Sequence, residues 1–311
     1  MNKNYEQLAQ LVVQSDTIII YRRDNPDENA YGSQLGLKEI IKTNFPDKNV
    51  YAAGENSEYL NPLGRMDRYD PALLSTSLAI VVDTPSSAWI DGDDWKECAT
   101  VIKIDNHPEK EVYGQIDIND QSVSSCSELI ANIALSLKWI LTPEASQCLL
   151  IGILEGTTNF LTSGLNKKTF TTLAKLVELS PSAHEILNRR AYASGEENKL
   201  KAYLVNHLKS TSLNTTWVFL PNKVLKRYNV EPNRASQFNW LLLDFATTEF
   251  CVLFVEYEDK KIRAQFSSKT RPVNMFAAKY GGWGTRHGAG AFLKNKKQAR
   301  EILATLASET F

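Results

Sequence analysis

The first half of the chain alternates short apolar runs with longer segments whose apolar residues recur every three or four positions. The runs are rich in β-branched residues and predict strands, whereas the periodic segments predict amphipathic helices. Strands are predicted at 16–21, 49–53, 78–83 and 99–105. Helices are predicted at 33–45, 125–140 and 144–156. This alternation favours an α/β fold with a mostly parallel sheet flanked by helices.

The pattern changes after about residue 165, where residues 169–179 and 184–208 follow a helical period. The polar segment 210–216 indicates a loop. Beyond it, strands are predicted at 216–221, 250–259 and 261–268, the last two as a hairpin turning at Asp259 and Lys260, and helices at 271–280 and 296–308 flank a glycine-rich loop. We therefore predict an α/β domain at 1–185, a helical connector at 186–214 and a smaller α+β domain at 215–311.

Composition narrows the class of protein. A chain of 311 residues is long enough for two domains, and 43% hydrophobic with 23% charged residues is typical of a globular protein. No apolar run approaches the ~18 residues of a membrane span, and the first residues lack an apolar signal segment. The four cysteines form no CxxC pair, which favours reduced thiols and a cytoplasmic protein without membrane contact.

Charge is distributed unevenly along the chain. Residues 215–311 hold 15 Lys and Arg against 8 Asp and Glu, a balance of +7. The rest of the chain holds 20 and 28, a balance of −8, and the two sum to the net charge of −1. A basic second half suits an anionic ligand, although ordinary surface variation explains the same numbers.

Three of the predicted strands are followed by carboxylates: Asp27, Asp83 and Asp105. Ligands of parallel α/β sheets bind beyond the carboxyl ends of the strands. Any one of these carboxylates is compatible with a helix cap or a turn. Three in succession, each after a β-branched run, indicate a site.

Five motifs follow one another in order: "NPDENAYGSQLGL", "VVDTPSSAWIDGD", "KIDNHP", "GILEGTTNFL" and "KYGGWGTRHGAGA". With them the chain resembles the DHH phosphoesterase family with its DHH-associated C-terminal domain, in the branch of the nano-RNases and pAp phosphatases. The resemblance covers nearly the whole chain. It implies two Mn²⁺ ions in the first domain and hydrolysis of phosphate esters of nucleotides or very short nucleic acids between the domains.

The motifs depart from the family pattern at the metal ligands. The resemblance implies metal ligation by Asp27 and Asp83, which are retained. The family's other ligands, in order His, Asp, His and Asp, are replaced by Arg23, Asn29, Asn106 and Gly156. We therefore expect the two-metal site to be largely dismantled and Mn²⁺ to bind weakly or not at all. A variant with all four family ligands restored tests this alignment by its gain of Mn²⁺ binding.

Arg23 stands where the family has a metal-binding histidine, and its guanidinium stays positive at any relevant pH. One hypothesis is that Arg23 replaces a cation and neutralises Asp27 and Asp83. The alternative is that it points to solvent while the acids cap helices. His107 and Asp105 are the candidate catalytic residues, although a histidine after a strand is more often structural.

The second half retains most of its motif. The resemblance and the residue types indicate substrate binding by backbone N–H groups, positive charge and a stacking ring. The candidate residues are Lys269, Arg271, Gly281, Gly282, Trp283, Gly284, Arg286 and His287. Thr285 stands at the family's usual histidine position. Core packing of Trp283 and a solvated strand end at Lys269 and Arg271 are the alternatives.

Three functions remain open. The first is a protein that binds a nucleotide or short single-stranded oligonucleotide between its domains, with weak or no hydrolysis. The second is an active metal-dependent phosphoesterase using Asp27, Asp83, Asp105 and His107 with one metal ion. The third is a structural or regulatory protein that binds another protein, and a homodimer is a further expectation. The absence of G-x-G-x-x-G after the first strand argues against a dinucleotide-binding oxidoreductase.

Overall fold

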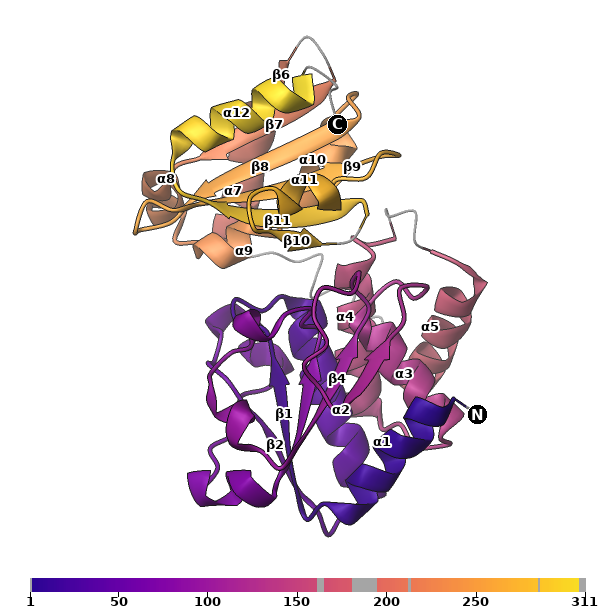
Figure 1. Cartoon of the computed structure of the whole chain (residues 1–311). Coiled ribbons are helices and arrows are strands. Elements are labelled where there is room, and N and C mark those ends of the chain that lie inside the picture. Colours follow the sequence, from indigo (N-terminus) through magenta and orange to yellow (C-terminus); the bar gives the residue numbers. More distant parts are fainter. Residues whose placement is uncertain (1, 161–164, 181–194, 212–213, 285, 308–311) are drawn as a thin grey trace. The chain divides into compact units, whose positions relative to one another are not determined.

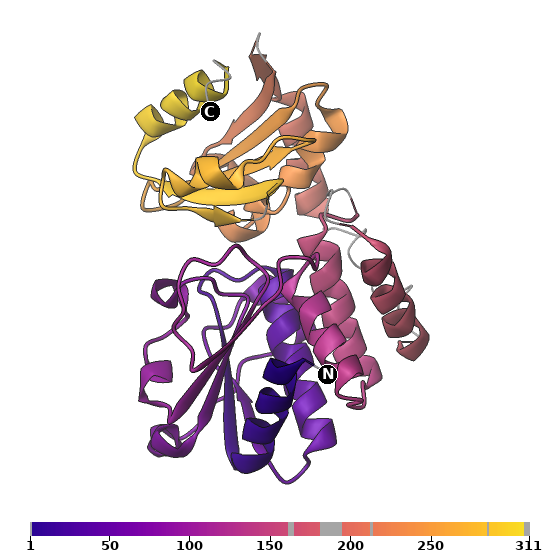
Figure 2. The same cartoon turned by 45° about the vertical axis from the view of Figure 1, so that its right-hand side comes forward.

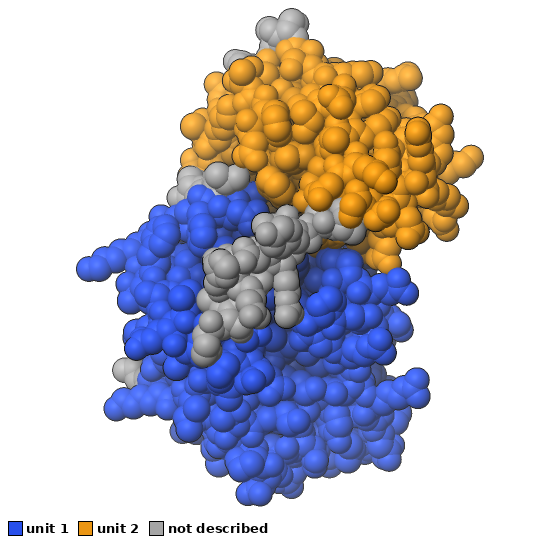
Figure 3. Space-filling model, turned by 180° about the vertical axis from the view of Figure 1, so that it is seen from behind, with its two compact units in different colours: residues 1–188 blue, residues 189–311 orange. Residues whose placement is uncertain are grey.

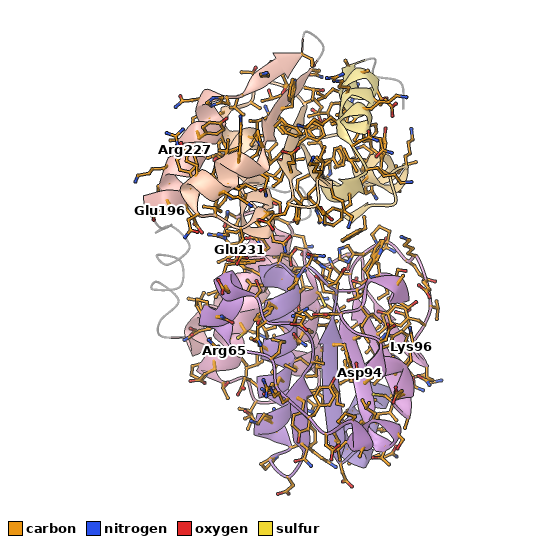
Figure 4. All side chains as sticks on the ribbon, turned by 90° about the vertical axis from the view of Figure 1, so that its left-hand side faces the viewer. Arg65, Asp94, Lys96, Glu196, Arg227 and Glu231 are labelled. Carbon is orange, nitrogen blue, oxygen red and sulfur yellow. The ribbon has the colours of Figure 1, made fainter. Side chains whose placement is uncertain are left out.

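The computed structural model describes residues 2–160, 165–180, 195–211, 214–284 and 286–307. It divides the chain into two compact units, residues 1–188 and 189–311 (Figure 3). Side chains fill the interior of both units (Figure 4). None of the described helices combines the length and the apolar character needed to cross a lipid bilayer. All four cysteines are buried free thiols, as the sequence predicts.

The first unit is built around a five-stranded parallel sheet with the strand order β2-β1-β3-β4-β5 (Figure 1). Its strands are β1 Thr17–Arg22, β2 Asn49–Ala52, β3 Leu78–Val82, β4 Thr100–Asp105 and β5 Ile116–Asn119. The first four confirm the predicted strands. The sequence analysis missed β5, because this edge strand is short and mostly half-buried and so carries a weak apolar signal.

Alternation along the strands separates two cores, one on each face of the sheet. Ile18 and Ile20 of β1 pack toward the helices, whereas Ile19 and Tyr21 join the core beneath short 3-10 turns. The helices gather on one face (Figures 1 and 2): α1 Lys3–Gln14, α2 Glu28–Asn44, α3 Cys126–Ser136, α4 Pro143–Gly156 and α5 Lys167–Leu179. Burial on both faces explains the continuous apolar runs of the central strands.

Helices α2 and α4 are in backbone contact, and glycines make this possible. A Cβ atom on Gly32 of α2 would lie 2.3 Å from the carbonyl oxygen of Cys148. On Gly36, one turn further along α2, it would lie 2.8 Å from Cδ2 of Leu149. This contact holds α2, and with it the site residues at its start, firmly against the unit.

The second unit contains a six-stranded mixed sheet with the order β10-β11-β9-β8-β7-β6. Its strands are β6 Lys209–Thr211, β7 Thr215–Leu220, β8 Phe250–Glu256, β9 Ile262–Ser268, β10 Trp283–Gly284 and β11 Gly288–Leu293. Its helices are α7 Gly195–Asn206, α8 Asn222–Tyr228, α9 Pro232–Ser236, α10 Asn239–Phe245, α11 Asn274–Ala278 and α12 Lys296–Ala307. The α+β character and the β8–β9 hairpin confirm the prediction.

Two segments of the second unit differ from the sequence-based expectation. Helix α7 lies in the range predicted as a connector, and it buries Leu200 and Leu204 in the core of the second unit. The segment predicted as a glycine-rich loop forms strands β10 and β11, which pair antiparallel. Glycine weakens the strand signal, so the sequence hid both strands. The predicted helical residues 184–194 lie outside the described part of the chain.

Candidate active site

Strands β1, β3 and β4 are neighbours and run parallel, so their carboxyl ends bring side chains from distant segments together. Arg23 follows β1, Asp83 follows β3, and Asp105 is the last residue of β4. Asp83 has φ of +52°, a left-handed conformation that aspartate tolerates better than most residues. Its side chain is almost fully buried, with 1% exposed. The ends of these three strands therefore bring Arg23, Asp83 and Asp105 into one cluster.

Arg23 points into the protein and contacts both carboxylates. Its Nη2 lies 2.5 Å from Oδ2 of Asp27, and its Nε lies 3.4 Å from Oδ2 of Asp83. Its Nη1 donates to the carbonyl oxygen of Asn25 at 2.6 Å. Burial opposes the charge of the guanidinium, but the two carboxylates outweigh it and raise the pKa of Arg23. Asp27 also caps α2 by accepting from the N–H of Ala30, so both roles considered for this aspartate are present.

Asn29 holds the other oxygen of Asp83. Its Nδ2 donates to Oδ1 of Asp83 at 2.7 Å, while its Oδ1 accepts from the N–H of Ser127 at 3.2 Å. Burial nevertheless raises the pKa of Asp83 to about 7, although His107 and Arg23 favour its charged form. An amide thus takes the place of a third carboxylate and avoids adding another buried negative charge.

His107 and Asp105 form a buried pair beside Asp83. Nδ1 of His107 lies 2.7 Å from Oδ1 of Asp105. Burial alone would lower the pKa of His107, but Asp105 raises it to about 9. Burial likewise opposes the charge of Asp105, and His107 outweighs it and lowers the pKa of this carboxyl. The pair is an ion pair at neutral pH.

Two buried oxygen atoms in this part of the site are available to bind a ligand. Oδ2 of Asp105 and Oδ1 of Asn106 are buried and have no hydrogen-bond partner among the described residues. Ligand atoms of Asp83, Asp105 and His107 all lie within 4.8 Å of one another, the one such His, Cys, Asp or Glu group in the described ranges. An ion with bonds of ~2.1 Å places ligand atoms on opposite sides ~4.2 Å apart. The ligand atoms of these three residues therefore need to move inward by only about a few tenths of an ångström to bind such an ion. These residues fit one divalent cation.

Gly156 lies at the end of α4, where a side chain would clash with the residues at the start of α3. A Cβ atom there would lie 2.5 Å from Cβ of Ser125 and 3.1 Å from the carbonyl oxygen of Ser124. Ser125 is the N-cap of α3 and accepts from the N–H of Glu128. The start of α3 therefore occupies the space that an aspartate side chain at position 156 needs. Restoring the family ligand there requires α3 to move.

The candidate substrate residues of the second unit cluster at one end of its sheet. Lys269 and Arg271 follow β9, and Arg286 and His287 precede β11. Backbone hydrogen bonds join the two segments, from the N–H of Ser268 to the oxygen of His287 and from the N–H of Val273 to that of Arg286. Burial lowers the pKa of His287. Thr285 lies outside the described residues.

The glycines of this segment serve the sheet itself. A Cβ atom on Gly282 would lie 2.2 Å from the carbonyl oxygen of Gly290, and one on Gly284 would lie 2.3 Å from Cα of Ala289. A Cβ atom on Gly281, which has φ of +72°, would meet none of the described residues within 4 Å. The close approach that the glycine density predicts is therefore made by β11, so glycine alone does not identify a phosphate loop here.

Sequence reasoning missed two buried, positively charged side chains, one at the end of β1 and one within β4. Arg22 donates to Asp91 at 2.6 Å, and Lys103 of β4 lies 3.3 Å from Asp117. Lys103 also donates to the carbonyl oxygen of Glu111 at 2.8 Å. A charged residue inside an apolar strand run was the available signal, because a buried charge requires a partner.

Residues 17–153 match the DHH family, N-terminal domain. The chain is 32% identical over 303 residues to the bifunctional oligoribonuclease and PAP phosphatase NrnA of Bacillus subtilis, with 96% of both chains covered. This chain belongs to the DHH family. The probable bifunctional oligoribonuclease and PAP phosphatase NrnA of Streptococcus mutans is 33% identical over 276 residues, 89% of each chain.

A solved structure shares its fold with nearly the whole chain. An exopolyphosphatase-related protein from Bacteroides fragilis superposes with a TM-score of 0.85 at 19% identity, covering 99% of this chain and 98% of that chain. Both the family resemblance and the α/β fold predicted from the motifs are therefore confirmed. In this fold, the contact of Arg23 with Asp83 is the feature that needs a functional explanation, because the family resemblance implies a metal-binding histidine at position 23.

Proposed function

We propose that this protein binds a nucleotide or short single-stranded oligonucleotide and acts weakly on its phosphate ester, with Arg23 in place of one of two metal ions. The observation that carries the proposal is the guanidinium of Arg23 between Asp27 and Asp83. The names of the bacterial relatives, oligoribonuclease and PAP phosphatase, support this substrate class. The basic balance of residues 215–311 suits such an anion.

Asp83, Asp105 and His107 are the residues that would hold the remaining divalent cation. When bound, such an ion polarises a phosphate oxygen and lowers the pKa of a bound water. Asp105 accepts from Nδ1 of His107, so Nε2 would become the ligand nitrogen once the ion displaces its proton. We take Mn²⁺, the ion implied by the resemblance, as the ion to test.

Arg23 supplies charge but not the rest of a metal ion's chemistry. Its guanidinium neutralises Asp27 and Asp83 and so keeps the buried carboxylates from repelling a phosphate. It cannot coordinate a water molecule and generate hydroxide, because it offers only N–H donors. The expected outcome is phosphate-ester binding with slow hydrolysis, in place of the fast two-metal reaction.

Release of phosphate from adenosine 3′,5′-bisphosphate, and cleavage of RNA dinucleotides, test this function. We expect slow Mn²⁺-stimulated turnover that Asp83→Ala abolishes. The triple variant Arg23→His, Asn29→Asp, Asn106→His is expected to be faster than the parent, whereas Arg65→His, at an exposed arginine of the same unit (Figure 4), serves as the matched control. Turnover unaffected by Asp83→Ala, or no binding of either substrate, would refute the proposal.

A further inference from the structure

One face of the second sheet is apolar over β8, polar over β9, and lined by two glycines and a phenylalanine on β11. Residues that face each other in antiparallel strands lie on the same side of a sheet. On β8 this side presents Cys251, Leu253 and Val255, which pack in the core formed with α7–α10. Their partners on β9 are Ser267, Gln265 and Arg263, and the next partners on β11 are Gly288, Gly290 and Phe292. We call Arg263, Gln265, Ser267, Trp283 and Asn239 the polar shelf.

Aromatic rings hold the guanidinium of Arg263 in place. It lies over the ring of Trp283 at 5.0 Å and over that of Phe292 at 4.8 Å, measured from Cζ to the ring centroids. Gly290 makes room beneath it, since a Cβ atom there would lie 2.3 Å from Oε1 of Gln265 and 3.0 Å from Nη2 of Arg263. The missing side chain thus lets both polar groups lie flat across β11, beside a half-buried Trp283.

Two carboxamides on the polar shelf have unused hydrogen-bonding capacity. Asn239 is 9% exposed, and its Nδ2 donates to Oγ of Ser267. Its Oδ1 is buried without a hydrogen-bond partner among the described residues. The half-buried carboxamide of Gln265 likewise has no partner in the described part of the chain. A buried acceptor without a donor destabilises the folded protein, and a ligand N–H would satisfy it.

The chemistry of these groups selects the kind of ligand. A phosphate only accepts hydrogen bonds, so it cannot satisfy Oδ1 of Asn239. A nucleobase offers donors, acceptors and a flat face on one rigid ring system, and carboxamides pair well with the adjacent donor and acceptor of adenine. Trp283 supplies a surface for stacking. The polar shelf thus has the parts needed to read a base.

We propose that the polar shelf recognises the nucleobase of the bound nucleotide. Oδ1 of Asn239 accepts from the exocyclic amine of adenine, and the carboxamide of Gln265 donates to the neighbouring ring nitrogen. Arg263 acts as a positioning residue, which fixes the plane of Trp283 for stacking. This inference rests on the proposed function and adds base recognition to it.

Calorimetric titration of the full chain with two nucleotides tests the proposal. The probes are adenosine 5′-monophosphate and purine riboside 5′-monophosphate, which lacks only the exocyclic amine. The parent is expected to bind the adenine nucleotide at least roughly tenfold more tightly, as one good base contact allows. Asn239→Ala and Gln265→Ala should each reduce that preference, whereas Asn206→Ala, at an exposed asparagine of α7, should retain it.

Each outcome separates base recognition from the function on which it rests. Equal affinity of the parent for both nucleotides would overturn the polar shelf while leaving nucleotide binding intact. Binding of neither nucleotide would overturn both proposals. The side chain of Gln265 is half-buried and makes no hydrogen bond to the described residues, so Gln265→Ala keeps the test valid if Asn239→Ala fails to fold.

Discussion

A guanidinium and a divalent metal ion both neutralise buried carboxylates, but they differ in what they bind next. Arg23 is 5% exposed and contacts Asp27 and Asp83 directly. The cluster therefore needs no added cation on that side. Taking Arg23 away leaves buried negative charge without its partner, which is far more costly than losing a surface ion pair.

Arg23→Ala is expected to lower the free energy of unfolding by about 3–5 kcal/mol in metal-free buffer, as measured by urea denaturation. Mn²⁺ should restore part of the loss, because an ion can enter the space between Asp27 and Asp83. Arg65→Ala, at an exposed position, is the control. An Arg23→Ala variant as stable as that control would show that the guanidinium is dispensable.

The same cluster predicts that stability falls as pH rises. Burial raises the pKa of Asp83 to about 7, so the folded chain keeps a proton that the unfolded chain releases near pH ~4. The resulting stabilisation is complete below that unfolded value and disappears as pH rises through about 7. His107 also contributes such a stabilisation, because Asp105 raises its pKa despite burial. This stabilisation disappears as pH rises through about 9.

We therefore expect the free energy of unfolding in EDTA to decline between about pH 4 and pH 9, through Asp83 up to about pH 7 and through His107 above that. Asp83→Asn should remove the lower part of the decline and His107→Gln the upper part. Denaturation at a series of pH values measures this. A flat profile for the parent chain over that range would contradict the titrations assigned to these two residues.

Gly156→Ala is expected to destabilise the protein by about 1–3 kcal/mol, because the added Cβ meets Ser125 at 2.5 Å. Gly195→Ala is the matched control, since a Cβ there, at the start of α7, meets none of the described residues within 4 Å. Thermal unfolding of the two variants measures the difference. Equal stability would mean that the start of α3 yields easily and that position 156 is still open to an aspartate.

At the scale of elements, the sequence predicted strands β1 to β4 and the carboxylates that follow three of them, because parallel burial leaves a strong apolar signal in β1, β3 and β4. It did not predict the contacts between those ends. Arg23 points inward or outward depending on the turn before α2, and Asn239 meets Ser267 only because α10 packs on β9. Such contacts depend on tertiary packing that a linear pattern does not encode.

Lys103 shows how an element can carry an unexpected charge. It is fully buried on β4 and ties that strand to Asp117 of β5 and to the backbone of Glu111. Lys103→Ala is expected to lower the free energy of unfolding by at least about 2 kcal/mol and to speed hydrogen exchange in residues 108–115.

The control for this effect is Lys96→Ala, at an exposed lysine paired with Asp93. Exposed ion pairs contribute little, so a change within ~1 kcal/mol is expected there. If the two lysine variants lost the same stability, the buried contacts of Lys103 would not hold β4 and β5 together.

At the scale of the whole molecule, the two units have separate cores, and each supplies its own residues to the function that we propose. The first contributes Arg23 and the group formed by Asp83, Asp105 and His107. The second contributes the basic segments around β9 and β11 and the polar shelf. Residues 189–311 hold 20 Lys and Arg against 10 Asp and Glu, whereas residues 1–188 hold 15 and 26, so the charge asymmetry seen in the sequence follows the division of the fold.

The stoichiometry of Mn²⁺ binding to the intact chain, measured by calorimetry with Asp83→Ala as control, tests the central claim most directly. With Arg23 in place of one cation, the parent is expected to bind one ion per chain, and Asp83→Ala to bind none. Two ions per chain would show that Arg23 does not take a cation's place. No binding at millimolar Mn²⁺ would show that Asp83, Asp105 and His107 do not form a metal site.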